Sequence, residues 1–400
     1  MRTRRLRAML PARRPRRLVM VTRIVALLLA VLFGLVACTS AASRGNGAAF
    51  VADSGPLDAV VKRTFTTYGV PLRSGRVLTE MTLAYETYGR LAPDGRNAIL
   101  ITHGFTSSGH AAGKYSPNDR TAGWWDGLIG PGKAIDTNRY YVVASNMLGS
   151  SYGSTAPASV NPATGKPYGP DFPDITVRDI VEAQRLLLSA LGVSHLVAVA
   201  GPSYGGFQAF QWGVTYPDFM NGIVSVVSQP RFRSSDTTAA MVSRFALDPN
   251  WNGGWHYERG GIPETMTEIR YETLMRYGAN ELLAVTIPDP AQREARLREM
   301  AAAWAREFDP NSMVTLRKAL DSYNTEPQLR AIRAKVLYVL SRTDKLFPPS
   351  IAPDVMDRLA NAGVDARYFE IDSDFGHSAS GPEWAKWGPT LKAFLESLDR

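Results

Sequence analysis

The sequence predicts an α/β fold in which a mostly parallel central sheet carries helices on both faces and a helical lid is inserted late in the chain. Short apolar runs of strand length alternate with helical patterns, which is typical of a parallel sheet. One of these runs leads through a sharp, glycine-containing turn directly into a helix. Roughly 100 residues, from about 230 to 330, show helical patterns only and separate two predicted strands.

The predicted strands and helices follow one another along the chain. An early antiparallel strand is expected at 78–89, and buried strands at 97–103, 139–145, 196–200, 222–228, 336–340 and 366–371. An amphipathic helix should begin after Thr176, which resembles a capping box together with Asp179, and end at Gly192. Further helices are expected directly after the strand at 196–200 and at 236–247, 264–277, 291–308, 311–324 and 382–398.

The turn after the strand at 196–200 reads Gly-Pro-Ser-Tyr-Gly and centres on Ser203. Strand, GxSxG and helix in this order form the nucleophile elbow of the α/β-hydrolase fold. The tight turn crowds the positions two before and two after the serine, which are Gly201 and Gly205 here. It also directs the first N–H groups of the helix at one point. We therefore predict Ser203 as the nucleophile and the Tyr204 N–H as an oxyanion donor.

A second GxSxG pattern, at residues 149–153, also follows an apolar run. The segment after it reads STAPASVNP, which cannot open a helix because of its prolines. Ser151 is therefore predicted to be a loop residue and not a nucleophile.

The predicted strand at 97–103 runs into a turn that reads His-Gly-Phe-Thr-Ser-Ser-Gly. In the α/β-hydrolase fold the turn at this place supplies the second oxyanion donor. We assign that donor to the Phe105 backbone N–H, with an ordinary strand-to-helix turn as the alternative.

The remaining members of a catalytic triad should follow the serine in the order acid, then histidine. His377 stands in a glycine-containing loop after the last predicted strand, whereas His256 lies within the expected lid. Asp344 follows the strand at 336–340, so it is the expected acid that orients the His377 ring. Asp372 and Asp374 are rivals, but they are so close to His377 in sequence that reaching its ring is awkward.

The formal net charge of +8 does not indicate a nucleic-acid partner. Residues 1–23 hold nine arginines and no acidic residue, and removing them leaves 36 basic against 37 acidic residues. The excess charge therefore belongs to the leader alone, and we expect no nucleic-acid binding.

The leader is typical of a bacterial lipoprotein signal. The basic stretch ends at Arg23, and an uncharged apolar run of 14 residues then leads to Leu-Val-Ala-Cys at 35–38. We expect a signal peptide at 1–37, a lipidated Cys38 that attaches the protein to the extracytoplasmic membrane surface, a flexible tether at 38–55 and a catalytic domain at 56–400. The alternatives are an uncleaved anchor and a true start at Met20.

Cys38 is the only cysteine. The mature chain therefore has no disulfide, no thiol nucleophile and no thiolate metal site. No residue cluster indicates a metal, and no glycine-rich loop indicates a nucleotide cofactor.

Longer shared segments are more specific than the elbow. They are LAYETYG at 83–89, GWWD at 123–126, GPGKAIDT at 130–137, YGST at 152–155, NPATG at 161–165, DFP at 171–173, DPNW at 248–251 and DKLFPP at 344–349. With them the sequence resembles the homoserine O-acetyltransferase family from about Ala84 to the C-terminus. The resemblance implies a triad of Ser203, Asp344 and His377, a helical lid that forms a deep acyl-donor tunnel, and often a dimer made through that lid.

The sequence also departs from the family pattern. The residue after the catalytic histidine is typically an aspartate that holds the substrate amine, but here it is Ser378. The family uses a lid arginine for the substrate carboxylate and a nearby tyrosine, which Arg270 and Tyr277 match in an alignment that is ambiguous by one residue; a solvated helix arginine is the alternative. Tyr204 replaces the usual methionine of the elbow and is expected to reshape the acyl pocket.

These observations predict a serine acyl-transfer enzyme that works on a small ester or thioester. Because acetyl-CoA is a cytoplasmic metabolite and Ser378 removes the amine partner, we expect an extracytoplasmic esterase. The alternative is an O-acetyltransferase that moves acetyl from the co-substrate acetyl-CoA to homoserine or another alcohol. A non-catalytic surface lipoprotein is a third possibility, which the complete triad disfavours.

Overall fold

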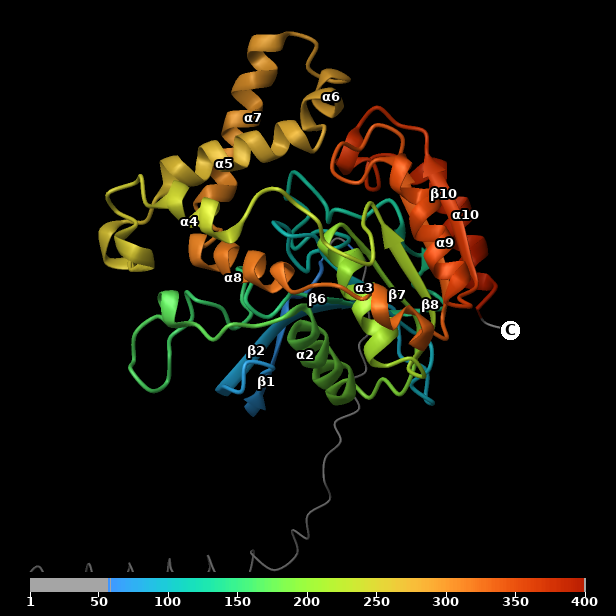
Figure 1. Ribbon diagram of the computed structural model, residues 1–400. Helices are drawn as coiled ribbons and strands as arrows, with labels where there is room; N and C mark the ends of the chain where they lie inside the picture. The colour runs from blue at the N-terminus through green and yellow to red at the C-terminus, as the bar shows by residue number, and fades with distance from the viewer. Residues whose placement is uncertain (1–56, 58, 399–400) are drawn as a thin grey trace, which may run out of the picture. The chain divides into compact units, whose positions relative to one another are not determined.

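A computed structural model describes residues 57 and 59–398 and centres on an eight-stranded sheet (Figure 1). The strand order within it is β1-β2-β6-β3-β7-β8-β9-β10. These strands are β1 (Arg63–Pro71), β2 (Val77–Tyr88), β3 (Ala98–Thr102), β6 (Tyr141–Ser145), β7 (Leu196–Pro202), β8 (Met220–Val226), β9 (Lys335–Ser341) and β10 (Ala366–Ile371). Only β1 with β2 and β2 with β6 pair antiparallel, so the sheet is mostly parallel, as predicted.

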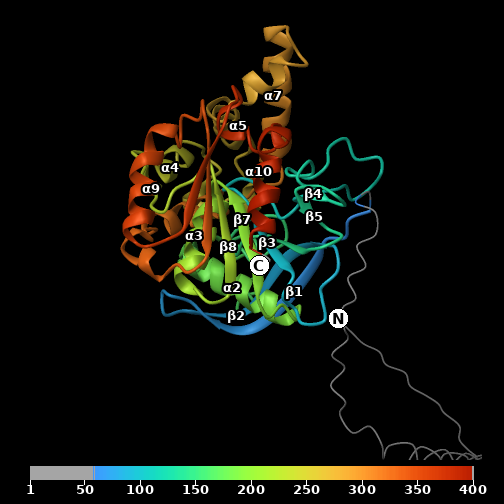
Figure 2. The ribbon, with the colours of Figure 1, turned by 90° about the vertical axis from the view of Figure 1, so that its right-hand side faces the viewer.

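The central strands are apolar on both faces because each face packs against a separate core. One core lies under α2 (Val177–Ala190), α3 (Tyr204–Thr215) and α9 (Ala352–Asn361). The other lies under α10 (Trp384–Glu396). Figure 2 shows α9 and α10 on opposite sides of the sheet. Buried strands such as β3 therefore read as continuous apolar runs rather than alternating ones.

The predicted lid appears as a helical insertion between β8 and β9, which we call the lid insertion (residues 227–334). It contains α4 (Thr238–Phe245), α5 (Pro263–Arg276), α6 (Ala279–Ala284), α7 (Pro290–Ala305) and α8 (Pro310–Asp321). Four of these helices match the predicted ones within a few residues, and α6 was not expected. The lid insertion lies beyond the carboxyl end of β7, since its side chains line a cavity together with Ser203.

Other differences from the predicted elements have local causes. The edge strand β1 was not expected, because Val70 is its only buried residue and the strand has no apolar run. The short helix α9 buries only Ala352, Val355 and Leu359, which is too few for its pattern to stand out. Also present are β4 (Ile129–Gly130) and β5 (Ile135–Asp136), and single 3-10 turns at Gly169–Asp171, Asn252–Gly254, Tyr257–Arg259, Glu326–Ala331, Pro349–Ile351 and Gly376–Ser378.

The predicted start of α2 is confirmed in detail. Thr176 accepts a hydrogen bond from the Asp179 N–H, and the Asp179 carboxylate accepts one from the Thr176 N–H. The predicted signal peptide, the tether up to residue 55 and Cys38 lie outside the described residues. Within the described part of the chain, no helix has the length and apolar character needed to cross a membrane.

Candidate active site

Ser203 occupies the strained corner between β7 and α3. Its backbone has φ 56° and ψ −119°, a region that residues other than glycine rarely adopt. The Ser203 N–H donates to the Val226 carbonyl at 2.8 Å, which ties the corner to β8. Strain of this kind is characteristic of the nucleophile elbow.

The glycines of the elbow are sterically required, as the sequence predicts. A Cβ added to Gly201 would lie 2.2 Å from Thr102 Oγ1, and one added to Gly205 would lie 2.3 Å from the Thr102 carbonyl oxygen. Thr102 at the end of β3 therefore leaves no room for a side chain at either position. Its hydroxyl donates to the Gly205 carbonyl at 2.9 Å, so the same residue also holds the turn.

The turn after β3 passes directly beside the elbow. A Cβ on Gly104 would lie 3.8 Å from Ser203 Cβ, so Phe105 follows a residue in contact with the nucleophile. The Phe105 ring stacks on the Tyr204 ring with centroids 6.0 Å apart. The Tyr204 N–H belongs to the first turn of α3 and has no intrahelical acceptor. Both predicted oxyanion donors therefore flank Ser203.

Asp344 and His377 are brought together from the ends of β9 and β10. Asp344 Oδ2 lies 2.8 Å from His377 Nδ1, and both side chains are buried. Asp344 Oδ1 accepts from the N–H groups of Leu346 and Phe347 at 2.8 and 3.2 Å. The carboxylate is thus held in one orientation and fixes the plane of the His377 ring.

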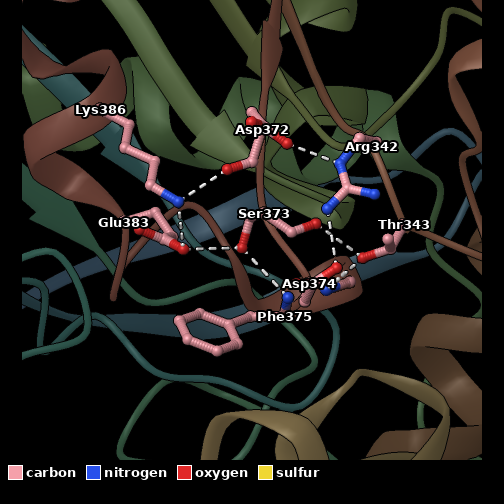
Figure 3. Close-up of polar contacts among 9 residues, drawn as sticks. Arg342, Thr343, Asp372, Ser373, Asp374, Phe375, Glu383 and Lys386 are labelled. Atoms are coloured by element: carbon pink, nitrogen blue, oxygen red, sulfur yellow. Dashed lines mark hydrogen bonds and ion pairs between the residues drawn. The ribbon is translucent and has the colours of Figure 1, made fainter.

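The two loops that carry Asp344 and His377 are joined by a polar network (Figure 3). Thr343 donates from Oγ1 to the Ser373 carbonyl at 2.9 Å and accepts from the Gly376 N–H at 3.1 Å. Arg342 pairs with the exposed Asp372 and Asp374 at 2.6 and 2.7 Å. Asp372 and Asp374, the two alternative candidates for the catalytic acid, therefore form ion pairs with Arg342, and neither contacts the His377 ring.

The same network reaches α10. Ser373 donates from Oγ to Glu383 at 3.0 Å and accepts from the Phe375 N–H at 3.0 Å. Lys386 donates to the Asp372 carbonyl at 2.7 Å and to Glu383 at 2.9 Å. The histidine loop is thus held from both flanks (Figure 3).

The free edge of His377 faces the aromatic wall of a cavity. Its Nε2 is buried and has no hydrogen-bond partner among the described residues. The ring lies 4.7 Å from the Tyr277 ring and 5.7 Å from the Phe347 ring, and both of these residues line the cavity. In structures without substrate, hydrogen bonds of catalytic groups are often long or absent until the substrate binds.

Ser203 opens into this cavity, which has a volume of about 360 Å³ and lies between the elbow and the lid insertion. Its inner wall is aromatic and apolar and consists of Phe105, Tyr204, Phe207, Phe232, Met241, Ile269, Tyr277, Met313, Leu320, Leu346 and Phe347. Four arginines also line it. Arg233, Arg244 and Arg276 are exposed at the solvent end and pair with Glu326, Glu272 and Asp236. Arg317 is buried against Phe232.

The predicted substrate-binding residues have different positions. Tyr277 lines the cavity directly, and burial raises the pKa of its phenol. Arg270 lies behind Thr106, to whose Oγ1 it donates at 2.7 Å, and burial lowers its pKa. Its Nε is enclosed and unpartnered, and within the described residues Arg270 forms no ion pair. Ser378 follows His377 and donates its N–H to the Tyr277 carbonyl at 3.0 Å.

The other serine and histidine candidates are structural. Ser151 lies in a loop, as predicted, and its Oγ accepts from the Asp309 N–H at 2.9 Å. His256 lies in the lid insertion, with Nε2 3.2 Å from Asp309 Oδ1. Among residues 57 and 59–398, no group of three or more His, Cys, Asp or Glu side chains could hold a metal ion.

Sequence reasoning missed the residues that hold the site in place. They include His103, Thr106, Thr343 and Trp304. Trp304 donates its indole N–H to the Thr106 carbonyl at 3.0 Å from 198 positions away. A contact between residues so far apart in the chain produces no pattern in a single sequence. The hydroxyl of Thr343, in contrast, stands next to the predicted acid Asp344 and could have been identified as a group that holds the site.

Comparisons with the sequences of known proteins identify the same fold and the same class of enzyme as the site does. Residues 97–382 match the family model described as the alpha/beta hydrolase fold. A homoserine O-acetyltransferase from Symbiobacterium thermophilum is 39% identical over 352 residues, which cover 82% of this chain and 92% of that protein. A homoserine O-succinyltransferase from Methylibium petroleiphilum is 37% identical over 354 residues, which cover 82% of this chain and 92% of that protein.

Solved structures point to the same fold. Homoserine O-acetyltransferase from Bacillus anthracis matches with a TM-score of 0.77 at 31% identity, covering 84% of this chain and 98% of that one. Esterase E22 matches with a TM-score of 0.76 at 32% identity, covering 84% of this chain and 100% of that one. Transferases and an esterase thus share this architecture. The chain is an acyl-transfer enzyme of the α/β-hydrolase fold and belongs to the homoserine O-acetyltransferase family.

Proposed function

We propose that this enzyme is an O-acyltransferase that moves a small acyl group from a thioester such as acetyl-CoA to an alcohol that carries a carboxylate, as homoserine does. The observation that carries the proposal is Arg270. In the part of the chain that the structure describes, this guanidinium lies beside the site without an acidic partner, and its enclosed Nε has no acceptor. A buried cation of this kind is stabilised when an anionic group of the substrate approaches it. The relatives support the same reaction, and it requires no cofactor.

The mechanism that we propose uses Ser203, Asp344 and His377. His377 Nε2 takes the proton from Ser203 Oγ as that oxygen attacks the thioester carbonyl. The N–H groups of Phe105 and Tyr204 stabilise the oxyanion, each by roughly 3 kcal/mol. His377 returns the proton to the departing thiolate and leaves an acyl-Ser203 ester. The acceptor alcohol then attacks this ester while His377 takes its proton, and the ester product leaves with Ser203 restored.

The arginines at the solvent end of the cavity fit a donor that carries phosphates. Arg233, Arg244 and Arg276 line this end, and because their ion pairs with Glu326, Glu272 and Asp236 are exposed and weak, a phosphate can compete for the guanidinium groups. Arginine binds phosphate with paired hydrogen bonds. The narrow, apolar inner wall then leaves room for a short acyl chain and the thioester arm at Ser203.

An esterase is the second candidate, and Ser378 favours it. A serine beside His377 provides no negative charge for the ammonium group of homoserine. The lining carboxylates Asp236 and Glu272 are paired with Arg276 and Arg244, so they are already neutralised. Water would then be the acceptor for the acyl-Ser203 ester, as the match to esterase E22 allows.

The deciding experiment supplies acetyl-CoA or p-nitrophenyl acetate to the wild type and to Ser203→Ala, each with and without L-homoserine. Acetylhomoserine formed faster than free acetate supports the transferase. Ser203-dependent hydrolysis without any acetylated alcohol supports the esterase. As a check on Arg270, 4-hydroxybutyrate and 1-butanol are compared as acceptors. The proposal expects the carboxylate of 4-hydroxybutyrate to lower KM by at least tenfold.

We further propose that residues 1–37 direct export and that Cys38 carries a lipid which holds the enzyme at the membrane surface, where the donor would be an extracytoplasmic ester or thioester and not the cytoplasmic pool of acetyl-CoA. The basic n-region, the apolar run and the cysteine support this. Metabolic labelling with a palmitate analogue should mark the wild type but not Cys38→Ser.

A dimer through the lid insertion is expected from the family resemblance, and light scattering of the purified protein measures it.

A further inference from the structure

The turn that contains Phe105 is held by two helices of the lid insertion. Trp304 of α7 donates its indole N–H to the Thr106 carbonyl at 3.0 Å, and the bond is buried. Arg270 of α5 donates to Thr106 Oγ1 at 2.7 Å, and its guanidinium lies 5.1 Å from the centre of the Trp304 ring. The carbonyl and the hydroxyl of the residue after Phe105 are therefore bound by the lid insertion.

The peptide before Phe105 is held from the sheet. The Met147 N–H donates to His103 Nε2 at 3.0 Å, so the ring proton must be on Nδ1. Nδ1 then donates to the Gly104 carbonyl at 2.9 Å. The Gly104 C=O and the Phe105 N–H belong to one planar trans peptide. The bonds that the Gly104 carbonyl accepts from His103 and, at 3.2 Å, from the Ser107 N–H therefore fix the direction in which the Phe105 N–H points.

We infer that Trp304 is a positioning residue for the Phe105 oxyanion donor. Phe105 stands between the Gly104–Phe105 peptide, held by His103, and the Thr106–Ser107 peptide, held by Trp304. Without the Trp304 bond, the second peptide keeps only the bond of 3.2 Å that the Ser107 N–H donates to the Gly104 carbonyl, so the backbone of Phe105 and Thr106 is restrained less firmly. The oxyanion donor is therefore held most firmly while α7 is in place.

The second oxyanion donor has a similar connection. The Tyr204 hydroxyl donates to the Leu316 carbonyl of α8 at 3.2 Å in a buried environment. Both donor residues are thus linked to the lid insertion, one through its neighbour and one through its own side chain. This inference rests on the proposed acyl-transfer mechanism, and it makes the lid insertion part of the oxyanion site and not only a cover over the cavity.

The first test compares Trp304→Phe, which keeps an aromatic ring but removes the N–H, with the wild type. The main readout is the inhibition constant of an alkyl trifluoromethyl ketone, which Ser203 converts into a tetrahedral oxyanion. We expect this constant to rise at least tenfold and kcat for p-nitrophenyl acetate to fall by a similar factor, with KM within about twofold. Trp255→Phe is the matched control, because Trp255 is a partly exposed lid residue, and it should behave as the wild type.

A wild-type inhibition constant and kcat in folded Trp304→Phe would overturn the inference, as would a change in KM alone. If that variant does not fold, benzothienylalanine at position 304 decides, because it keeps the double ring of tryptophan and replaces only the N–H that bonds to the Thr106 carbonyl. It should raise the inhibition constant several-fold, and a wild-type constant would contradict the inference. These readouts require no acceptor alcohol, so they stand if the transferase proposal fails. A wild type that neither binds the ketone nor hydrolyses the ester would instead refute the acyl-transfer mechanism.

Discussion

Asp344 Oδ2 lies 2.8 Å from His377 Nδ1, while the other carboxylate oxygen of Asp344 is held by two backbone N–H groups. The acid therefore orients the ring and does not turn toward solvent. We expect Asp344→Asn to lower kcat by about four orders of magnitude with little change in folding, because the amide imposes the wrong ring tautomer. Steady-state kinetics with p-nitrophenyl acetate measures this. Asp372→Asn, which changes an exposed partner of Arg342, is the control and should retain nearly full activity.

The histidine loop depends on Thr343, whose hydroxyl joins it to the loop of Asp344 through Ser373 and Gly376. Thr343→Val should lower kcat several-fold because the His377 ring is then held less firmly, and Thr343→Ser should restore activity. The kcat–pH profile is the informative readout, since a loosened Asp344–His377 pair shifts its acid limb. A valine variant with a wild-type profile and wild-type kcat would show that the loop needs no such connection.

The elbow tolerates no side chain at Gly205. A Cβ there would meet the Thr102 carbonyl at 2.3 Å, so Gly205→Ala should destabilise the fold by about 1–3 kcal/mol and lower kcat as the elbow shifts. Gly388→Ala is the matched control. A Cβ there would lie 3.5 Å from Leu128 Cδ2, which is an ordinary contact, and only the following Pro389 restricts the added methyl group. Urea denaturation of both variants compares them, and equal stability would disprove the steric argument.

We expect position 378 to separate homoserine from acceptors without an amine. Ser378→Asp places a carboxylate beside His377, so we expect KM for L-homoserine to fall about tenfold while KM for 4-hydroxybutyrate stays the same or rises. Acetyl transfer to each acceptor, followed by chromatography, provides the comparison. An equal effect on both acceptors would mean that position 378 does not contact the amine.

His103 links stability to pH. Burial lowers the pKa of the His103 ring from 6.5 to about 4. Between these pH values the unfolded chain binds a proton at His103, whereas the folded protein does not. The contribution of His103 to stability is complete above pH 6.5 and is lost as the pH falls from 6.5 toward 4. At pH 5 the loss should be about 2 kcal/mol. Urea denaturation between pH 7 and 5 measures it, with His103→Asn as the variant that lacks this dependence and His195→Gln as a control.

Much of the chemistry could be predicted from short stretches of sequence. Ser203 stands in a GxSxG turn that identifies the elbow, although the closest crowding at Gly201 and Gly205 comes from Thr102 of β3 and is seen only in the structure. Asp344 and His377 could be assigned because each follows a strand in the order that this fold requires. The helical lid could be predicted as well, since helical periodicity is a local signal and no strand pattern interrupts residues 230–330.

The sequence by itself determined the fold class, the family and the three residues expected at the reacting centre. Each of these depends on residues that are neighbours in the chain or on the order of residues along it. Only the tertiary structure decided how those residues are held. Trp304 meets Thr106 across 198 positions, and Thr343 meets Gly376 across 33, because helix packing and strand order bring these segments together. Such contacts depend on distances in space, which local periodicity and spacing do not encode.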